Sequence, residues 1–433
     1  MPNVLWVCSE VGGVNWFRAK MPHDALVASK RRGEDFGILN YDPALIVRRN
    51  WEMDLYGDPD TAWRIKYDTL TAVGWADVVV WMGLHSPEAL NLFKLSKVRH
   101  PHVKHLMEID DFLLSSSRSN PQAGEVYRYG GDLAKIGLEQ MRHSDGIIVS
   151  TPTLAEMYKP YAKKIFVVEN VVDLSLWPKP KAEASKNLTI GWIGAGSHDD
   201  DLGLLRGVIP HILAKYPNVE FSIVHGCPEF FKHKDDCEFL LNPRDPRYKK
   251  MKKCTKCGGL DRVRWTHDFK TIDKYPKWAA SFGFDIGIAP LVDINFTRGK
   301  SNLRWLEYSA MGRPTIASPL NHFRETIRDG ETGIVLKDNS PESWIEAIET
   351  LIEDQDLRKA IGKNAREEVV RNWSPAVMAK KYRAVIQEIT HAQPHEVGAS
   401  DAGGSVDKRP IEHKVYSRPE ASRNPEMAGT ICP

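Results

Sequence analysis

The amino-acid sequence predicts an α/β protein built from two doubly wound, Rossmann-like domains. The first observation is a repeated alternation of short, wholly apolar runs with longer amphipathic stretches, beginning at residues 3–8 (NVLWVC). The second is a Pro-containing linker at residues 174–187, after which a new apolar run starts. Because parallel strands need long crossover connections, which are usually helices, this alternation favours two parallel sheets covered by helices.

The first half of the chain supplies one of these sheets. Its opening apolar run is followed by a glycine-containing loop and by an amphipathic segment at residues 16–32, which predicts a strand, a turn and a helix. The same pattern returns in residues 76–90, 103–114, 144–158 and 164–173. In a sheet of this kind, ligands bind at the carboxyl ends of the strands, so the loops that follow the apolar runs are the candidate site.

The second half repeats the arrangement. After the run at residues 188–193, further strands are expected in residues 219–226, 261–269, 284–291, 313–318 and 333–338, with helices between them. Residues 340–389 are expected to be helical throughout.

These patterns predict domain boundaries. The N-terminal domain covers residues 1–178, and the C-terminal domain covers residues 186–374, including a Cys-rich, basic insertion at 227–262. Residues 375–392 form a C-terminal helix. Residues 393–433 are rich in Pro, Gly and Ser and have few large apolar side chains, so we expect them to be disordered.

Composition indicates an ordinary globular protein. Of the 433 residues, 42% are hydrophobic and 27% are charged, and the formal net charge of +2 predicts no global attraction to polyanions. No apolar run is long enough to span a membrane, and the first residues lack a basic stretch before their short apolar run. We therefore expect a cytoplasmic protein without a transmembrane segment.

The segment at residues 284–318 carries the clearest functional pattern. It predicts a strand, a polar loop, a helix and a second strand, with Gly299, Lys300, Ser301 and Asn302 at the start of the helix. Backbone N–H groups, the positive end of the helix dipole and the Lys300 charge together suit a diphosphate. The competing interpretation is an ordinary strand-loop-helix unit in which Ser301 caps the helix.

Glu307 and Arg304 lie further along the same helix. The Glu307 carboxylate can accept hydrogen bonds from a sugar hydroxyl near the pocket, and Arg304 can add positive charge. Together with the loop, these groups favour a nucleoside diphosphate ligand. Arg304 could instead be a surface residue of the helix.

The motif KSNLRWLEYSAMGRPTIAS resembles the donor-binding region of GT-B glycosyltransferases, in particular the retaining family 4, or group 1, in a divergent KSxLRxLE branch. In that family two glutamates stand eight positions apart. Glu307 matches the second, which binds the nucleotide ribose, whereas Gly299 stands where the first would be. The resemblance covers most of residues 3–390 and implies a GT-B fold, in which two Rossmann-like domains face a common cleft and the last helix crosses back to the first domain.

The resemblance extends to two glycine-containing loops. Gly12 and Gly13 follow the first predicted strand, where the resemblance places them facing the cleft, and a plain tight turn is an equally good interpretation. Gly194, Gly196, Ser197 and His198 follow the first strand of the second domain, where relatives carry an arginine and a lysine that bind the diphosphate. This chain has neither, so backbone amides and His198 are the expected substitutes.

Three side chains that follow strands of the first domain are candidates for acceptor chemistry. Asp110 and Asp111 come after one apolar run and His85 after another, so both positions lie at the predicted cleft edge. A carboxylate there can bind acceptor hydroxyls or assist their deprotonation. Helix capping or a solvated turn is the competing interpretation.

The resemblance implies transfer of a sugar from a nucleotide-diphosphate sugar to an acceptor hydroxyl, with retention at the anomeric carbon and without a catalytic metal. The leaving phosphate itself can accept the acceptor proton in a front-face mechanism, so no protein nucleophile is required. Asn170 and Asp173 match a recurring N-x-x-D element of the family, for which we expect a structural role at the domain junction.

The insertion contains possible binding sites for a metal ion and for a polyanion. Cys254 and Cys257 form a knuckle that, with Cys227 and Cys237, can hold structural zinc, with free thiols as the alternative. Residues 244–264 are strongly basic, which suits DNA phosphates, although solvated surface charge is the competing interpretation.

Two alternative functions follow. The enzyme could act on hydroxylated or otherwise modified bases in DNA, or the chain could be a degenerate fold that binds a nucleotide sugar or nucleic acid without turnover. Salt-dependent DNA binding through Lys249–Lys253 would favour the first alternative, and binding without product would favour the second.

Overall fold

The fold is that of a computed structural model of the chain. The structure describes residues 2–8, 13–40, 69–84, 86–115, 132–180, 187–194, 198–224, 262–266, 270–271 and 274–391.

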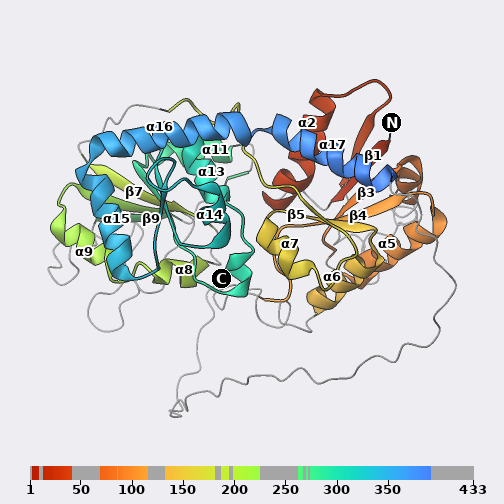
Figure 1. The fold of residues 1–433 in the computed structure, drawn as a ribbon, viewed down its shortest axis with the longest axis horizontal. Coiled ribbons are helices and arrows are strands. Elements are labelled where there is room, and N and C mark those ends of the chain that lie inside the picture. Colours follow the sequence, from red (N-terminus) through yellow and green to blue (C-terminus); the bar gives the residue numbers. More distant parts are fainter. Residues whose placement is uncertain are drawn as a thin grey trace, which may run out of the picture. The chain divides into compact units, whose positions relative to one another are not determined.

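The N-terminal lobe is built on a parallel sheet with the strand order β2-β1-β3-β4-β5-β6 (Figure 1). Each strand is short, and β1, β3 and β5 are almost wholly apolar, as expected for parallel strands that are covered on both faces. The strands are β1 (Asn3–Cys8), β2 (Asp35–Asn40), β3 (Val78–Met82), β4 (Lys104–Ile109), β5 (Gly146–Val149) and β6 (Ile165–Val167).

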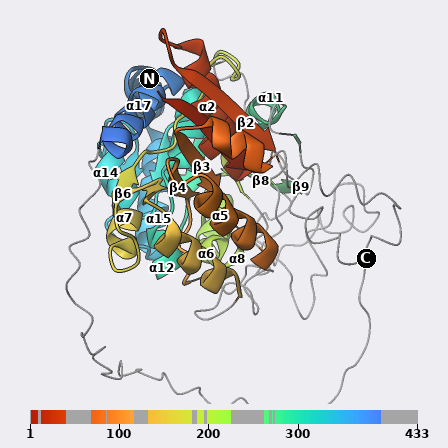
Figure 2. The ribbon, with the colours of Figure 1, turned by 90° about the vertical axis from the view of Figure 1, so that its right-hand side faces the viewer.

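Helices cover both faces of this sheet. On one face α2 (Met21–Ala28) and the last helix of the chain pack against β1, β3 and β4. On the other face α5 (Pro87–Arg99), α6 (Asp132–His143) and α7 (Pro152–Tyr158) contribute to the core, and α5 and α6 lie next to each other (Figure 2). The sheet is therefore doubly wound, as predicted.

The C-terminal lobe has a second parallel sheet, with the order β12-β11-β10-β7-β8-β9. Its strands are β7 (Leu188–Ile193), β8 (Val219–Val224), β9 (Val263–Thr266), β10 (Ile286–Ala289), β11 (Thr315–Ala317) and β12 (Ile334–Val335). The first of these begins directly after the predicted linker. Two separate doubly wound sheets thus confirm the predicted fold class.

Apolar side chains again fill both faces of the second sheet. One face is covered by α8 (Asp199–Gly203), α9 (Val208–Lys215) and α15 (Pro341–Glu353). The other is covered by α11 (Tyr275–Ser281), α13 (Leu303–Ala310) and α14 (Asn321–Thr326). α16 (Gln355–Asn372) supplies apolar side chains to both cores.

The turn between α13 and β11 depends on a glycine. Gly312 has a φ of 69°, and its N–H donates to the carbonyl of Ser309 at 2.9 Å. The N–H of Arg313 donates to the carbonyl of Tyr308 at 2.9 Å, so the last carbonyls of α13 are satisfied. This turn ends the helix and returns the chain to the sheet, as the Gly-x-Pro sequence indicates.

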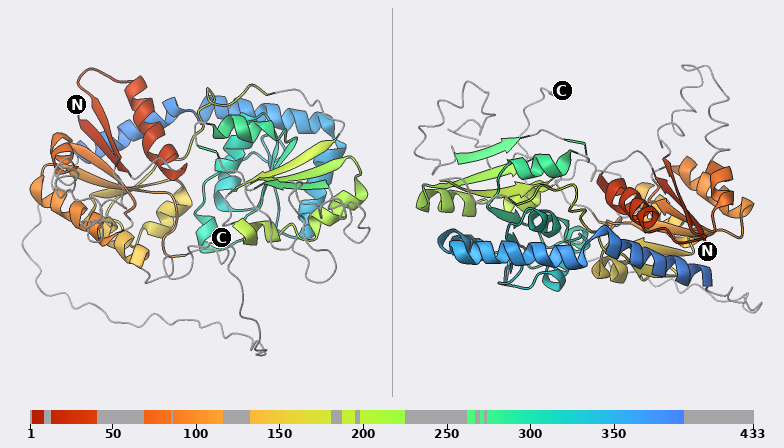
Figure 3. Two further views of the ribbon diagram at one scale, coloured as in Figure 1. Left: turned by 180° about the vertical axis from the view of Figure 1, so that it is seen from behind. Right: turned by 90° about the horizontal axis from the view of Figure 1, so that it is seen from above.

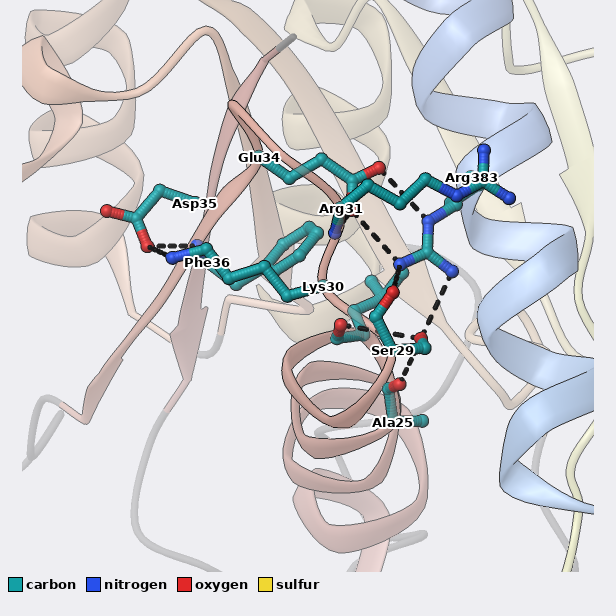
Figure 4. A network of polar contacts seen from close by, with 9 residues as sticks. Ala25, Ser29, Lys30, Arg31, Glu34, Asp35, Phe36 and Arg383 are labelled. Carbon is teal, nitrogen blue, oxygen red and sulfur yellow. Dashed lines mark hydrogen bonds and ion pairs between the residues drawn. The ribbon is translucent and has the colours of Figure 1, made fainter.

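The last helix, α17 (Pro375–His391), belongs to the core of the N-terminal lobe. Figures 1 and 3 show this blue helix beside the red helix α2. The Arg383 guanidinium donates to both Glu34 carboxylate oxygens at 3.1 Å, and to the Ser29 carbonyl at 2.7 Å (Figure 4). The described part of the chain therefore begins and ends in the same lobe.

A second polar contact holds α17 against the core of the lobe. The Tyr382 hydroxyl donates to Glu108 Oε2 on β4 at 2.7 Å, and both side chains are fully buried. Trp6 packs against the Tyr382 ring, with the ring centroids 5.9 Å apart. Burial of a carboxylate requires such donors, because an unpaired charge in the core is strongly unfavourable.

Replacing Tyr382 by phenylalanine should lower the free energy of unfolding of this lobe by about 1–3 kcal/mol, because Glu108 Oε2 loses a buried donor. Urea denaturation followed by tryptophan fluorescence measures the change. The matched control is Tyr216→Phe, which removes a hydrogen bond from the Tyr216 hydroxyl to the exposed Glu353. Equal effects of the two substitutions would contradict the prediction.

Three elements differ from the sequence prediction. The strand β2 was not predicted, and the amphipathic segment at residues 16–32 is divided into a π-helical turn, η1 (Trp16–Lys20), and α2. The helical stretch at residues 340–389 is broken at two points, since Asp354 caps α16 by accepting from the Leu357 N–H at 2.8 Å, and α17 begins only at Pro375. A side-chain cap of this kind competes with helix continuation, which apolar periodicity does not reveal.

Candidate functional site

The loop between β10 and α13 is shaped by two helix ends. The short helix α12 (Asn295–Arg298) closes at Gly299, and α13 begins after Asn302. Ser301 does not cap α13; its Oγ instead accepts a hydrogen bond from Asn170 Nδ2 at 2.9 Å. The interpretation of Ser301 as an ordinary helix cap is therefore wrong, because this hydroxyl is held by the segment that follows β6.

Lys300 contacts one of the predicted catalytic acids, Asp111. Its Nζ donates to Asp111 Oδ1 at 2.7 Å and lies 4.3 Å from the centre of the Phe296 ring. Burial alone would lower the pKa of Lys300, but the nearby Asp111 carboxylate outweighs it and raises the pKa. Lys300 therefore stays a cation, at a point where groups from β10–α13 and from the end of β4 meet.

Asp110 and Asp111 follow β4 directly. The Tyr158 hydroxyl donates to the Asp111 carbonyl at 2.7 Å and accepts from the Leu113 N–H at 2.9 Å, which fixes this turn. Burial raises the pKa of Asp110 to about 6, the Asp111 charge adds to the increase, and Lys300 and Arg18 oppose it. A carboxyl group with such a pKa can exchange a proton near neutral pH.

Glu307 is almost completely buried, with 3% of its side chain exposed. Arg304 Nη1 donates to Glu307 Oε2 at 2.6 Å and to the Tyr275 hydroxyl at 3.3 Å. Burial raises the pKa of Glu307, and the Arg304 charge opposes that shift. Arg304 is thus the partner of Glu307 rather than a solvated surface residue of the helix.

The position of the absent first glutamate is closely packed. The Thr151 hydroxyl at the start of α7 donates to the Gly299 carbonyl at 3.2 Å. A Cβ atom at residue 299 would lie 3.1 Å from Leu154 Cδ1, which is tighter than an ordinary contact. Gly299 therefore allows α7 to approach the loop, and a glutamate would need its neighbours to shift.

Asn302 is a buried amide at the entrance to α13. Its side chain is fully buried, and neither its oxygen nor its nitrogen has a hydrogen-bond partner among the residues that the structure describes. A buried amide without partners is unfavourable unless something supplies them. Asn302 is therefore a candidate ligand group in the predicted donor loop.

His198 stands at the start of α8, where the predicted second loop ends. Its Nδ1 lies 2.7 Å from Asp201 Oδ2, and its ring packs against Trp192. The other oxygen of Asp201 accepts from the Val292 N–H at 2.7 Å, which joins α8 to the loop after β10. Gly194 follows β7, and its N–H donates to the Val224 carbonyl at 3.3 Å.

Several predicted residues lie outside the described part of the chain. They are Gly12, His85, Gly196, Ser197 and the four cysteines Cys227, Cys237, Cys254 and Cys257. Gly13 is described and opens α1 (Gly13–Asn15). Within the described ranges, no group of three or more His, Cys, Asp and Glu side chains could hold a metal ion. The zinc site thus stays a prediction.

Of the basic insertion, the structure describes two arginines, and both make contacts within the C-terminal lobe. Arg262 donates to the carbonyls of Tyr216 and Val219 at 2.7 Å. Arg264 pairs with Glu220 at 2.7 Å. These two side chains support the edge of the sheet.

Sequence reasoning missed Arg18, Asp201 and Tyr275. Arg18 is fully buried in η1 and pairs with Glu108. In the sequence it occupies a position that is typical of the exposed, polar face of an amphipathic helix. Asp201 lies in an acidic run that is typical of a helix start, and Tyr275 is distant from Glu307 in sequence. No local pattern identifies these three residues, because Glu108, the Val292 N–H and Arg304, which they contact, lie on other elements.

Comparison with known proteins finds similarity to glycosyltransferases. Residues 303–368, which begin with α13 and include Glu307, match the family model of Glycosyl transferases group 1. Solved structures match over nearly the whole chain. HepE from Anabaena, in complex with UDP and glucose, has 12% sequence identity and a TM-score of 0.59, covering 90% of this chain and 100% of its own.

The fold is GT-B. A sucrose-phosphate synthase from Thermosynechococcus elongatus matches with the same TM-score of 0.59, 14% identity and coverage of 91% of this chain and 100% of its own. The solved structures confirm the predicted GT-B fold. The match of residues 303–368 to Glycosyl transferases group 1 agrees with the resemblance that the KSNLRWLE segment indicated.

Curated relatives match over shorter stretches. An uncharacterized glycosyltransferase of Methanocaldococcus jannaschii is 35% identical over 86 residues, covering 20% of this chain and 22% of its own. An alpha-D-kanosaminyltransferase of Streptomyces kanamyceticus is 26% identical over 178 residues, covering 41% of this chain and 44% of its own. The chain thus spans less than half the length of these relatives. Separately, none of the described helices combines the length and apolar character needed to cross a bilayer.

Proposed function

We propose that this protein is a glycosyltransferase that moves a sugar from a nucleotide-diphosphate sugar to an acceptor hydroxyl. The observation that carries the proposal is the contact between Lys300 and Asp111, which joins the predicted donor loop to the predicted acceptor side. The match of residues 303–368 to group 1 glycosyltransferases supports it. So does the complex of HepE with UDP and glucose, since that neighbour has the same fold.

In this proposal the donor lies against the start of α13. Lys300, the loop amides and the Asn302 side chain hold the diphosphate, and Glu307 accepts hydrogen bonds from the ribose. Arg304 keeps Glu307 ionised and in place through their 2.6 Å contact. Gly194 and His198 belong to the same donor side. The energetic task of these groups is to stabilise negative charge as it develops on the leaving diphosphate.

The acceptor lies on the side of Asp110 and Asp111. The bond between the anomeric carbon and the diphosphate breaks, and the acceptor oxygen forms the new glycosidic bond on the same face of the sugar. The acceptor proton passes to the departing phosphate oxygen. The configuration is retained because the new bond forms on the face that the diphosphate leaves. Asp110 accepts a hydrogen bond from another hydroxyl of the acceptor and so aligns the attacking oxygen for this transfer.

Lys300 and the helix terminus supply the positive charge that this transfer requires, so we propose turnover without a catalytic metal. Activity should persist in EDTA. The configuration of the product, determined by NMR, tests retention.

The deciding experiment measures nucleoside diphosphate release from a panel of nucleotide sugars. Wild-type protein is compared with Glu307→Ala, in the presence of hydroxylated small acceptors, unmodified DNA or DNA bearing hydroxymethylated bases. Release that depends on Glu307 supports the proposal and names the donor, and stimulation by modified DNA alone identifies DNA as the acceptor. Nucleotide-sugar binding by the wild type without release from any donor would overturn turnover in favour of the binding-only alternative.

The acid limb of the pH profile should report Asp110. Because the pKa of this carboxyl is raised to about 6 and the ionised form accepts the hydrogen bond, kcat/KM should fall about tenfold per pH unit below that value. The pH dependence of product formation measures it. In Asp110→Asn the limb should disappear, together with most of the activity. An unchanged limb in that variant would assign the titration to another group.

The insertion adds a separate prediction. If Cys227, Cys237, Cys254 and Cys257 bind structural zinc, purified protein should contain about one equivalent of zinc by elemental analysis. The paired substitution Cys254→Ser and Cys257→Ser should remove it, whereas Cys8→Ser, which changes a buried cysteine of β1 outside the insertion, should not. Metal-free wild-type protein would favour free thiols.

A further inference from the structure

A buried chain of polar groups runs from the core of the N-terminal lobe to the donor loop. Arg18 Nε donates to Glu108 Oε1 at 2.8 Å, and Arg18 Nη2 lies 2.6 Å from the same oxygen as an ion pair. Its Nη1 donates to the Val168 carbonyl at 2.7 Å and to Asn170 Oδ1 at 2.9 Å. Asn170 Nδ2 then donates to Ser301 Oγ at 2.9 Å.

The chemistry of these groups fixes the direction of every hydrogen bond. A guanidinium group only donates, so the atom of Asn170 that faces Arg18 must be its carbonyl oxygen. The amide nitrogen of Asn170 must then face Ser301, and it can only donate. Ser301 Oγ is therefore the acceptor in this contact, and its own proton must point elsewhere.

Burial makes this orientation rigid. Arg18 and Glu108 are fully buried, and Asn170 is 4% exposed. Reversing the amide would place its N–H₂ group against the guanidinium, where two donors would face each other without water to compensate. Among the residues that the structure describes, the Ser301 hydroxyl donates to none, so its proton is available to a ligand.

We infer that Asn170, held by Arg18, is a positioning residue that turns the Ser301 hydroxyl into a hydrogen-bond donor for the diphosphate of the bound donor substrate. This inference rests on the proposed function, because Ser301 lies between Lys300 and Asn302 in the loop assigned to the diphosphate. It gives Asn170 a role in binding as well as in the junction between the two lobes. It also explains why a buried arginine lies in η1, distant from any ligand group in sequence.

The substitution Asn170→Asp tests the direction of the hydrogen bond with almost no change in shape. Both oxygens of the aspartate accept, so Arg18 remains paired while the Ser301 hydroxyl must donate to residue 170 and is lost to the ligand. The added negative charge also weakens anion binding by itself. A double-mutant cycle with Ser301→Ala separates the two effects, because the charge acts in both backgrounds and the hydroxyl in only one.

The experiment measures dissociation constants of inorganic pyrophosphate and of UDP by isothermal titration calorimetry. The proteins are the wild type, Asn170→Asp, Ser301→Ala and the double variant, and their melting temperatures are recorded to establish folding. Ser301→Ala should weaken binding about 10- to 100-fold, as expected for a hydrogen bond to a charged group. Asn170→Asp should raise the dissociation constant by a factor that is at least about tenfold smaller in the Ser301→Ala background than in the wild type. Ser301→Thr, which keeps the hydroxyl, should bind within about threefold of wild type.

The outcomes separate this inference from the proposed function. Coupling seen with pyrophosphate or UDP supports the inference even if no nucleotide sugar is turned over. Equal effects of Asn170→Asp in both backgrounds would overturn it even if sugar transfer is established. Failure of Ser301→Ala to weaken either ligand, or of the wild type to bind either one, would also overturn it.

Discussion

Replacing Lys300 by methionine should lower kcat/KM for sugar transfer by about 100- to 1,000-fold. Removal of one group that stabilises developing negative charge typically costs this much, and Lys300 is the cation that the described structure places in the donor loop next to Asp111. Methionine keeps much of the apolar length of the side chain, so the packing against Phe296 is largely preserved. Initial rates of nucleoside diphosphate release measure the effect.

The pH profile gives this prediction a second readout. Lys300 opposes the rise in the pKa of Asp110, so in the methionine variant the acid limb should move to higher pH. The control is Lys277→Met, which removes an exposed lysine from α11 of the same lobe and should leave the rate within about twofold. A Lys300→Met enzyme within about threefold of wild type would exclude the assigned role.

Glu307→Ala should weaken nucleoside diphosphate binding by about 10- to 100-fold, because the ribose hydroxyls lose a charged acceptor. The effect should depend on the sugar of the nucleotide. Wild-type protein should bind a ribonucleoside diphosphate more tightly than its 2′,3′-dideoxy counterpart, and the variant should bind both equally. Calorimetry with the two ligands measures this difference.

Arg304, the ion-pair partner of Glu307, determines which control is needed. Removing Glu307 leaves the partly buried Arg304 without its carboxylate, which is itself destabilising. The double variant Arg304→Met, Glu307→Gln removes both charges, so it should recover thermal stability without recovering the discrimination between ribose and dideoxyribose. Discrimination that survives in Glu307→Ala would assign the ribose to another residue.

Local chemistry explains why so much of the fold was predictable. Apolar runs such as residues 78–82 bury all of their side chains only in strands covered on both faces. The Gly-x-Pro sequence at Gly312 is typical of the end of a helix. The strand β2 was missed because DFGILN mixes polar residues and glycine with apolar ones. The division of residues 16–32 into η1 and α2 was missed because hydrophobic spacing does not distinguish a π-helical turn from an α-helical one.

The candidate site was predictable where its chemistry is contiguous in sequence. Lys300, Ser301, Asn302 and Glu307 lie on one loop and one helix, so a single segment contained the pattern. The acids after β4 were predicted for a different reason: the carboxyl ends of parallel strands share one edge of a sheet, where ligands bind. The partners of these residues were not, since Arg304 could have faced solvent and Ser301 could have capped its helix.

The sequence by itself determined the two doubly wound sheets, the loop that carries the donor-binding pattern and the acids after β4, because each depends on side chains that are neighbours along the chain. Only the tertiary structure shows that Lys300 contacts Asp111 and that α7 packs closely against Gly299. It also shows that Asn170 forms hydrogen bonds with both Arg18 and Ser301. These contacts join residues far apart in sequence. Their energies depend on burial and on the direction of hydrogen bonds, which exist only once the chain has folded.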